Sequence, residues 1–280
     1  MNCLIFGCGY LGRRVASAWI AQGRKVAGVT RRPEHAAELQ ALGIAPIIAD
    51  VVVPASLTRL PRADTVLYAV GLDRNSGAAM RAVYVDGLAN VLDALPRPER
   101  FVYVSSSSVY GQTEGDWVDE DSPTEPQEES GRIVLEAERL LHAKLPESMI
   151  LRFAGIYGPG RLLRQKAIQA GEPIVGDADK WLNLIHVDDG VRTVLAAEKR
   201  AGPGSIYNVC DDQPVRRRDF YAEMARVLNA PAPRFETPAA DQPTPPHEKA
   251  NRRIRNGRIR GELGVALRYP NYLGGLQAVV

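Results

Sequence analysis

Cysteine and histidine are scarce in this chain of 280 residues, which contains three cysteines and four histidines. The cysteines (Cys3, Cys8 and Cys210) are an odd number and form no cluster with metal-ligand spacing. We therefore expect neither a disulfide framework nor a metal site. A chain of this kind is expected by default to be cytoplasmic.

An excess of charge of one sign is also missing, because 35 lysines and arginines face 33 aspartates and glutamates and the formal net charge is +2. The densest basic stretch, residues 249–260, contains no aromatic side chain on which a base could stack. We therefore expect no nucleic-acid partner and interpret the stretch as a solvated basic face. The alternative is that one or two of its arginines bind an anionic substrate.

Long apolar runs are missing as well. Arg13 and Arg14 interrupt the first apolar stretch, and no basic region precedes it. We expect neither a signal peptide nor a membrane span, and no membrane partner. The chain is nevertheless 45% hydrophobic, which suffices for a sizeable core in one large domain or in a main domain with a smaller one.

A glycine-rich turn follows the first short apolar segment. Its sequence is Gly7-Cys8-Gly9-Tyr10-Leu11-Gly12. Between a strand and a helix, the first glycine permits a tight turn, the second lets a pyrophosphate approach the backbone, and the third lets the helix pack close to the strand. Phosphate then lies at a helix N-terminus. The turn predicts a dinucleotide-binding site, with a merely structural turn as the alternative.

Acidic residues are absent from the end of the next expected strand, residues 26–30. An Asp or Glu about twenty residues after the glycines would hold the ribose hydroxyls of NAD, but this chain has Thr30, Arg31 and Arg32 there. Two guanidinium groups can pair with the extra phosphate of NADP. The prediction is NADP(H) in preference to NAD(H). The alternative is a solvated turn with surface arginines.

Apolar, strand-like segments alternate with helical ones along the chain, as a doubly wound parallel α/β sheet requires. Six prolines within residues 231–246 predict an extended loop in a smaller C-terminal part. The further expected strands are residues 45–52, 65–70, 101–105 and 149–156, and the expected helices are residues 34–42, 78–95 and 131–145.

Several sequence blocks in this order resemble the extended branch of the short-chain dehydrogenase/reductase superfamily, especially its NAD-dependent epimerase/dehydratase-like members. The blocks are the glycine turn, Asp50-Val51, Ala69-Val70-Gly71, residues 102–111, residues 151–160, residues 183–189 and Tyr207-Asn208-Val209. The resemblance implies a Rossmann-type sheet over residues 1–155 with a return at about 183–212. It implies a smaller substrate-binding part over 156–182 and 213–280.

The resemblance also implies cofactor roles for the residues after the strands. Asp50 would accept a hydrogen bond from the adenine amino group, with the Val51 backbone beside it. Asp50 could equally cap the turn that follows it. Ala69, Val70 and Gly71 would let the chain pass close to the cofactor ribose, although small residues at a strand exit are also common without a ligand.

In the family that the sequence resembles, catalysis depends on a serine, a Tyr-x-x-x-Lys pair and an asparagine. The serine falls on Ser106, with Ser107 as its nearest competitor. In the other three positions this chain departs from the family: Ser130 stands where tyrosine is expected, Val134 where lysine is expected, and Tyr84 where asparagine is expected. A serine hydroxyl cannot replace a phenol as an unaided base. The usual proton-transfer pair is therefore expected to be absent.

Two explanations of this departure remain open. Chemistry could use a different acid or base, or the chain could be a non-catalytic NADP(H)-binding sensor or regulatory protein. The titratable residues near the aligned segments are Tyr110, Glu128, Glu129, Tyr157 and His186. Each has a structural alternative, in packing and loop shape for the tyrosines and the histidine and at a helix N-terminus for the glutamates.

The expected function is that of an atypical NADP(H)-binding oxidoreductase or epimerase/dehydratase-like enzyme. Its substrate is expected to be a small polar metabolite, with a nucleotide sugar as one class, held with the help of Arg161 and Asn183. The resemblance also implies a homodimer that pairs through the helices at 78–95 and 131–145, but the departures from the family lie on these same helices.

Overall fold

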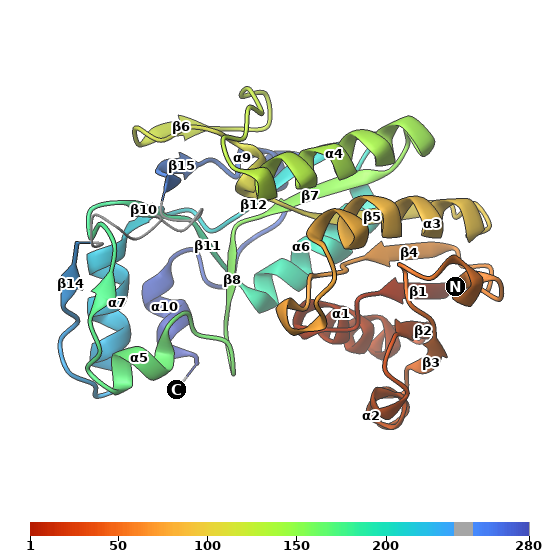
Figure 1. Ribbon diagram of the computed structural model, residues 1–280, viewed down its shortest axis with the longest axis horizontal. Helices are drawn as coiled ribbons and strands as arrows, with labels where there is room; N and C mark the ends of the chain where they lie inside the picture. The colour runs from red at the N-terminus through yellow and green to blue at the C-terminus, as the bar shows by residue number, and fades with distance from the viewer. Residues whose placement is uncertain (238–248, 280) are drawn as a thin grey trace.

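The centre of the computed structural model, which describes residues 1–237 and 249–279, is a sheet of seven parallel strands in the order β12-β7-β5-β4-β1-β2-β3 (Figure 1). The order reverses between β4 and β1, so the sheet is doubly wound, as the sequence predicts. The strands are β1 (Asn2–Phe6), β2 (Lys25–Thr30), β3 (Ala45–Ile48), β4 (Thr65–Tyr68), β5 (Arg100–Ser106), β7 (Met149–Phe153) and β12 (Ile206–Val209).

Helices cover both faces of this sheet. Successive strand residues point to opposite faces, so Cys3 and Ile5 join one apolar cluster while Leu4 and Phe6 join the other. The first cluster is closed by α1 (Tyr10–Ala21), α6 (Val187–Arg200) and α9 (Gly257–Gly261), and the second by α3 (Gly87–Ala94) and α4 (Glu129–Lys144). We call the sheet and these helices the first lobe.

Short elements connect the strands of the first lobe. They are η1 (Pro33–His35), α2 (Ala36–Ala41), η2 (Pro54–Leu57), η3 (Arg74–Ser76), η4 (Ala82–Asp86) and η5 (Ser107–Val109). Within the described residues, no helix is long and apolar enough to cross a bilayer.

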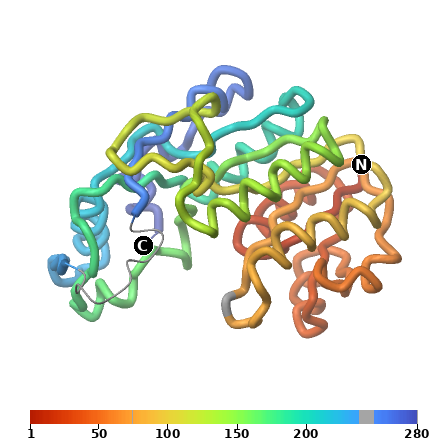
Figure 2. The backbone as a smooth tube through the Cα atoms, turned by 45° about the horizontal axis from the view of Figure 1, so that its top comes forward, coloured from red at the N-terminus to blue at the C-terminus, as the bar shows by residue number. Residues whose placement is uncertain are grey.

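A second lobe has an apolar core of its own, which includes Tyr157, Ile174, Phe220 and Leu276. Figure 2 shows this lobe as the gathering of green and blue segments beside the sheet. Its elements are β8 (Gly155–Tyr157), α5 (Gln165–Gln169), β9 (Ile174–Val175), β10 (Trp181–Leu182), β11 (Leu184–His186), β13 (Val215–Arg216), α7 (Arg217–Val227), β14 (Phe235–Glu236) and α10 (Tyr272–Gln277). A further parallel pair joins β6 (Asp116–Val118) to β15 (Arg252–Ile254).

Three expected elements differ most from the structure, while the strand expected over 65–70 ends at Tyr68 and the helix expected over 34–42 is divided into η1 and α2. The strand expected over residues 149–156 is broken after Phe153, because Gly155 turns into β8 and pairs with β11 instead of the large sheet. A Cβ at Gly155 would lie 3.2 Å from the Asn183 carbonyl oxygen, so the close approach of the two chains favours a glycine here. The strand expected over 45–52 ends at Ile48, where the turn around Asp50 begins.

The helix expected over residues 78–95 is the third difference. It contains a π-helical turn, η4, before α3 begins at Gly87. π-Helical turns inside helices are rare and occur frequently at functional sites. Of the proline-rich segment, residues 231–237 are described and include β14, whereas residues 238–246 lie outside the described part of the chain.

Candidate functional site

The glycine turn packs directly against the end of β4. Gly7 has a φ of +89°, and a Cβ at this position would lie 2.2 Å from the Ala69 carbonyl oxygen. A Cβ at Gly12 would lie 2.3 Å from the Gly7 carbonyl oxygen. Gly9 and Gly71 differ, because a Cβ there would meet no atom within 4 Å. Two of these glycines thus fix the turn, and the other two leave open backbone.

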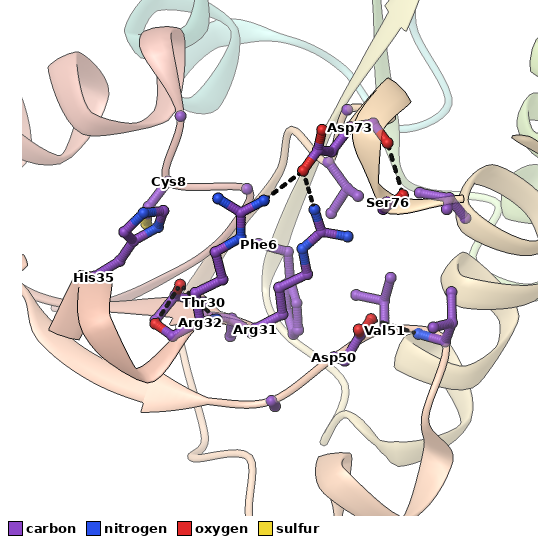
Figure 3. A pocket seen from close by; sticks show the side chains of 18 of the residues that line it. Phe6, Cys8, Thr30, Arg31, Arg32, His35, Asp50, Val51, Asp73 and Ser76 are labelled. Carbon is purple, nitrogen blue, oxygen red and sulfur yellow. Dashed lines mark hydrogen bonds and ion pairs between the residues drawn. The ribbon is translucent and has the colours of Figure 1, made fainter. Parts of the chain in front are cut away.

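A cavity of about 740 Å³ lies over this turn at the carboxyl ends of β1, β2 and β4 (Figure 3). Ligands of open α/β sheets bind at this edge, where the strand order reverses. The structure brings most of the expected cofactor residues together in its lining, namely Gly7, Gly9, Tyr10, Thr30, Arg31, Arg32, Asp50, Val51, Val70 and Gly71. The other three, Leu11, Gly12 and Ala69, line an adjoining cavity.

Arg31 and Arg32 converge on one carboxylate across this cavity. The Nη2 atoms of both arginines contact Oδ2 of Asp73, at 2.7 Å for Arg32 (Figure 3). The arginine and aspartate side chains are about one third to one half exposed, with values of 34%, 45% and 30% for Arg31, Arg32 and Asp73. This ion pair joins segments 42 residues apart in sequence, and no local sequence pattern predicts it.

Asp50 caps the turn that follows it and also lines the first cavity. Its Oδ1 accepts a hydrogen bond from the Val52 backbone N–H at 3.1 Å, so the side chain caps the turn that follows. The Ser56 hydroxyl fastens the same turn by donating to the Asp50 carbonyl oxygen at 2.9 Å. Asp50 also lines the cavity, and the turn therefore holds this carboxylate at a fixed place beside it.

A second cavity, of about 650 Å³, continues from the first toward the end of β5. Gly7, Gly9 and Gly71 line both cavities. The side chains that distinguish the second cavity are Met80, Tyr84, Ser105, Ser106, Ser108, Val134 and Arg161. Of the two competing serines, Ser106 belongs to this lining and Ser107 does not.

Two hydroxyl groups in the second cavity accept backbone hydrogen bonds. Ser106 Oγ accepts from the Ser108 N–H at 3.1 Å, and Tyr84 Oη accepts from the Leu72 N–H at 3.2 Å. An accepted bond leaves the hydroxyl proton available for donation. Tyr84 lies on η4, and in the sequence it stands at the position where the family's asparagine is expected. The family's asparagine lies at the catalytic site, so a tyrosine at its position was the signal that could have placed this phenol in the site.

The five titratable residues considered as replacement acids or bases lie outside the linings of both cavities. Tyr110, Tyr157 and His186 are all at most 2% exposed. Burial raises the pKa of both tyrosines and lowers the pKa of His186. Glu128 pairs with Lys249 at 2.9 Å, and Glu129 is exposed in the first turn of α4.

The two expected substrate residues have different surroundings. Arg161 lines the second cavity, where its guanidinium lies over the Tyr10 ring at 5.4 Å and Nε donates to the Ile156 carbonyl oxygen. Asn183 lies outside both linings. Its amide donates to the Arg252 carbonyl oxygen at 2.9 Å and accepts from the Ile254 N–H at 2.8 Å, so it fastens β15. Its substrate role stays a prediction.

A buried polar cluster lies directly behind the serine end of β5. The Arg152 guanidinium donates to Glu138 Oε2 at 2.8 Å, and the Ser105 hydroxyl donates to Glu138 Oε1 at 2.5 Å. Arg152 also donates to the Tyr110 hydroxyl at 3.1 Å, which in turn donates to Asn208 Oδ1 at 2.8 Å. The cluster ties β5, α4, β7 and β12 together and supports the wall that carries Ser106.

Comparison with known proteins agrees with this geometry. The model of the NAD dependent epimerase/dehydratase family matches residues 3–210. Protein YeeZ of Escherichia coli (strain K12) is 30% identical over 279 residues, which cover 96% of each chain. A second relative is the 4-hydroxy-2-methyl-3-oxo-4-farnesyl-3,4-dihydroquinoline-1-oxide ketoreductase of Stigmatella aurantiaca. It is 29% identical over 230 residues, which cover 76% of this chain and 69% of that one.

A solved structure extends the similarity over nearly the whole chain. A functionally unknown conserved protein from Silicibacter pomeroyi is 32% identical with a TM-score of 0.81, covering 99% of this chain and 97% of that one. The family match spans the glycine turn, the serine end of β5 and the return strand β12. The resemblance seen in the sequence is thereby confirmed, and this chain belongs to the NAD dependent epimerase/dehydratase family.

Proposed function

We propose that the protein is an NADP(H)-dependent oxidoreductase or epimerase/dehydratase-like enzyme. The dinucleotide would occupy the first cavity, and a small polar metabolite would occupy the second. Family membership and the similarity to a ketoreductase support a nicotinamide-dependent reaction. The open backbone at Gly9 and Gly71 fits the close approach of a pyrophosphate and a ribose.

The preference for the phosphorylated dinucleotide rests on the convergence of Arg31 and Arg32 beside the cavity. Their guanidinium groups meet at one anionic oxygen, that of Asp73. Two guanidinium groups that donate to one carboxylate oxygen from two sides can also donate to a phosphate, which offers three acceptor oxygens. Without a carboxylate at the end of β2, the ribose hydroxyls of NAD lack their usual acceptor. This convergence is the observation that carries the proposal.

The proposed catalytic residues are Ser106 and Tyr84. When bound, the cofactor supplies or accepts a hydride. In the reducing direction, the Ser106 hydroxyl polarises the substrate oxygen and the Tyr84 phenol donates the proton that this oxygen needs. The Leu72 N–H holds the phenol oxygen so that its own proton can point into the cavity. Tyr84 would thus take over the proton transfer for which Ser130 and Val134 are unsuited.

An anionic substrate is the class that best fits the second cavity. Arg161 brings a guanidinium into the lining of this cavity. Among the described lining residues the acidic side chain is Asp73, which is already paired with Arg31 and Arg32. A guanidinium binds phosphate oxygens well. A nucleotide sugar, with phosphates and a polar ring, is the proposed substrate class.

The second candidate function is that of a non-catalytic NADP(H) sensor, and one observation favours it. Val134, at the position expected for lysine, is 4% exposed and lines the second cavity. Its isopropyl group can neither donate a hydrogen bond to a ribose nor lower the pKa of a neighbouring phenol. A sensor would bind the dinucleotide and show no turnover with any substrate.

The cofactor proposal is tested by calorimetric titration of the purified chain with NADPH and with NADH. Replacing Arg31→Asp together with Arg32→Ala is expected to weaken NADPH binding about 100-fold, because two charge-assisted hydrogen bonds are lost. NADH binding should change less than about threefold, since it has no phosphate at this place. Arg97→Ala, which removes an exposed arginine paired with Glu147, is the control. Equal losses for both dinucleotides would contradict the phosphate assignment.

The catalytic proposal is tested with Ser106→Ala and Tyr84→Phe in a screen of nucleotide sugars, followed by NADPH absorbance. Both variants should bind NADPH as the unaltered chain does and lose turnover by about 100-fold or more, since general acid–base groups contribute 10²–10⁴. Ser107→Ala is the matched control, because it removes a neighbouring hydroxyl outside the cavity. Unchanged turnover in Ser106→Ala would remove this serine from the mechanism.

A further inference from the structure

The loop after β4, residues 71–78, borders both cavities, and we call it the strap. Gly71 and Asp73 line both cavities, Ser76 and Ala78 line the first, and Leu72 lines the second. Among the contacts of the described side chains, Arg31 and Arg32 pair with Asp73 of the strap, and the Leu72 N–H of the strap donates to the Tyr84 hydroxyl. The strap therefore lies where a dinucleotide and a substrate would meet.

Asp73 divides its two oxygens between the strap and the arginines. Its Oδ1 accepts from the Asn75 N–H at 3.0 Å and caps the short helix η3. Its Oδ2 takes both guanidinium groups (Figure 3). The cap is internal to the strap, whereas the contacts of Oδ2 cross the cavity. Loss of the Oδ2 contacts would thus leave the fold of the strap itself in place.

The charges at this point show why Asp73 and a ribose phosphate compete. Two arginines and one aspartate together carry a net charge of +1. A phosphate monoester brings about −1.5 to −2 at neutral pH. With Asp73 still in contact, the group would become net negative, and two anions would lie beside each other. With Asp73 moved away, two guanidiniums and a phosphate are close to neutral.

We propose that Asp73 is a specificity-determining counter-ion that competes with the 2′-phosphate of NADP(H) for Arg31 and Arg32. Binding of the phosphate transfers both guanidiniums from the aspartate to the phosphate and releases the strap from β2. NAD(H) lacks the 2′-phosphate, and its pyrophosphate would lie at the glycine turn, so the contacts of Asp73 with Arg31 and Arg32 stay in place when it binds. This inference rests on the proposed function, because it requires the phosphate to lie at these arginines.

Release of the strap also reaches the second cavity. Leu72, next to Asp73, donates to the Tyr84 hydroxyl. Gly71 and Gly77 flank this part of the strap, and a Cβ at either would meet no atom within 4 Å, so both ends border open space. The 2′-phosphate is thereby coupled to the position of the proposed proton donor.

The decisive variant is Asp73→Asn, which keeps the size of the side chain and removes its charge. We expect NADPH and adenosine 2′,5′-bisphosphate to bind about five- to tenfold more tightly in calorimetry, because competing surface ion pairs of modest strength are lost. NADH binding should stay within about twofold. Asp121→Asn is the matched control, since it removes one exposed carboxylate, paired with Arg258, that lines neither cavity.

A second readout follows the strap itself. Hydrogen–deuterium exchange of residues 71–78 should become faster with saturating NADPH than with saturating NADH in the unaltered chain. In Asp73→Asn, exchange should be fast with either dinucleotide. Equal exchange with both dinucleotides in the unaltered chain would overturn the release of the strap.

The binding results separate this inference from the function on which it rests. If the Arg31→Asp, Arg32→Ala chain shows no selective loss of NADPH, the phosphate assignment fails and the inference fails with it. If that loss occurs but Asp73→Asn binds NADPH equally or more weakly, the assignment stands and the competition is refuted. Weaker binding would mean that Asp73 orients the arginines for the phosphate instead of competing with it.

Discussion

Two arginine–carboxylate clusters in this protein use the same chemistry in opposite surroundings. Arg152 and Glu138 pair behind β5 with side chains 5% and 4% exposed. Arg31, Arg32 and Asp73 pair at the first cavity with side chains about one third to one half exposed. A buried pair that loses one partner leaves an uncompensated charge, whereas an exposed pair can exchange its partner for water or a ligand.

The neighbours of the two clusters differ in the same way. Ser105 and Tyr110 complete the hydrogen bonds of the buried pair, so it belongs to the framework. In the exposed cluster, two guanidinium groups contact a single carboxylate oxygen. The two positive charges of the arginines therefore exceed the one negative charge of the aspartate. The first arrangement holds β5 in place, and the second is suited to exchanging its carboxylate for another anion.

The largest effect is expected from removing the buried carboxylate. Glu138→Ala should lower the free energy of unfolding by about 3–5 kcal/mol, because Arg152 would remain buried without its counter-charge. Glu136→Ala on the same helix is the control, since Glu136 is exposed and pairs with Arg81, and it should cost less than about 1 kcal/mol. Urea denaturation measures both. Similar values for the two variants would show that burial does not distinguish these clusters.

A smaller effect is expected from the hydroxyl that extends the buried cluster. Tyr110→Phe should cost about 1–3 kcal/mol, because Asn208 Oδ1 and an Arg152 N–H each lose a buried partner. Tyr68→Phe is the matched control: Tyr68 is 1% exposed, but its hydroxyl has no hydrogen-bond partner in the part of the chain that the structure describes. Denaturation should find Tyr68→Phe neutral or stabilised, and an equal loss in both would argue against the cluster.

The smallest change in stability is expected at the exposed cluster. Asp73→Asn should alter the free energy of unfolding by less than about 1 kcal/mol, because exposed ion pairs contribute little. The difference from the unaltered chain should shrink further in high salt, which screens exposed charges. Denaturation in low and high salt measures this. A loss as large as that of Glu138→Ala would make Asp73 a structural residue and not an exchangeable counter-ion.

The parts of the fold that the sequence predicts are those with a local signal. The alternation of apolar segments predicts the doubly wound sheet, and the positive φ of Gly7 accounts for the glycine turn. The break between β7 and β8 has no such signal, because apart from Arg152 and Gly155 the side chains of residues 149–156 are apolar on both sides of it. It depends on pairing between Gly155 and Leu184, which are distant in sequence.

The candidate site divides along the same line. Arg31 and Arg32 follow β2 and Ser106 ends β5, so their place at the edge of the sheet can be predicted. Asp73 and the Tyr84 hydroxyl act through contacts with segments that the chain brings together only after folding. Arg161 reaches the second cavity as expected, whereas the Asn183 amide is taken up by the β15 backbone.

The path of the chain between the lobes limits how the protein can move. The backbone passes from the first lobe to the second after β7, after β12 and between α9 and α10, and it is back in the first lobe at α6 and at α9. A rotation of one lobe relative to the other would have to bend all of these crossings together, so they limit such a rotation. Access to the cavities then depends on the segments that border them, and the strap, which the ion pairs of Asp73 with Arg31 and Arg32 fasten, is one of these.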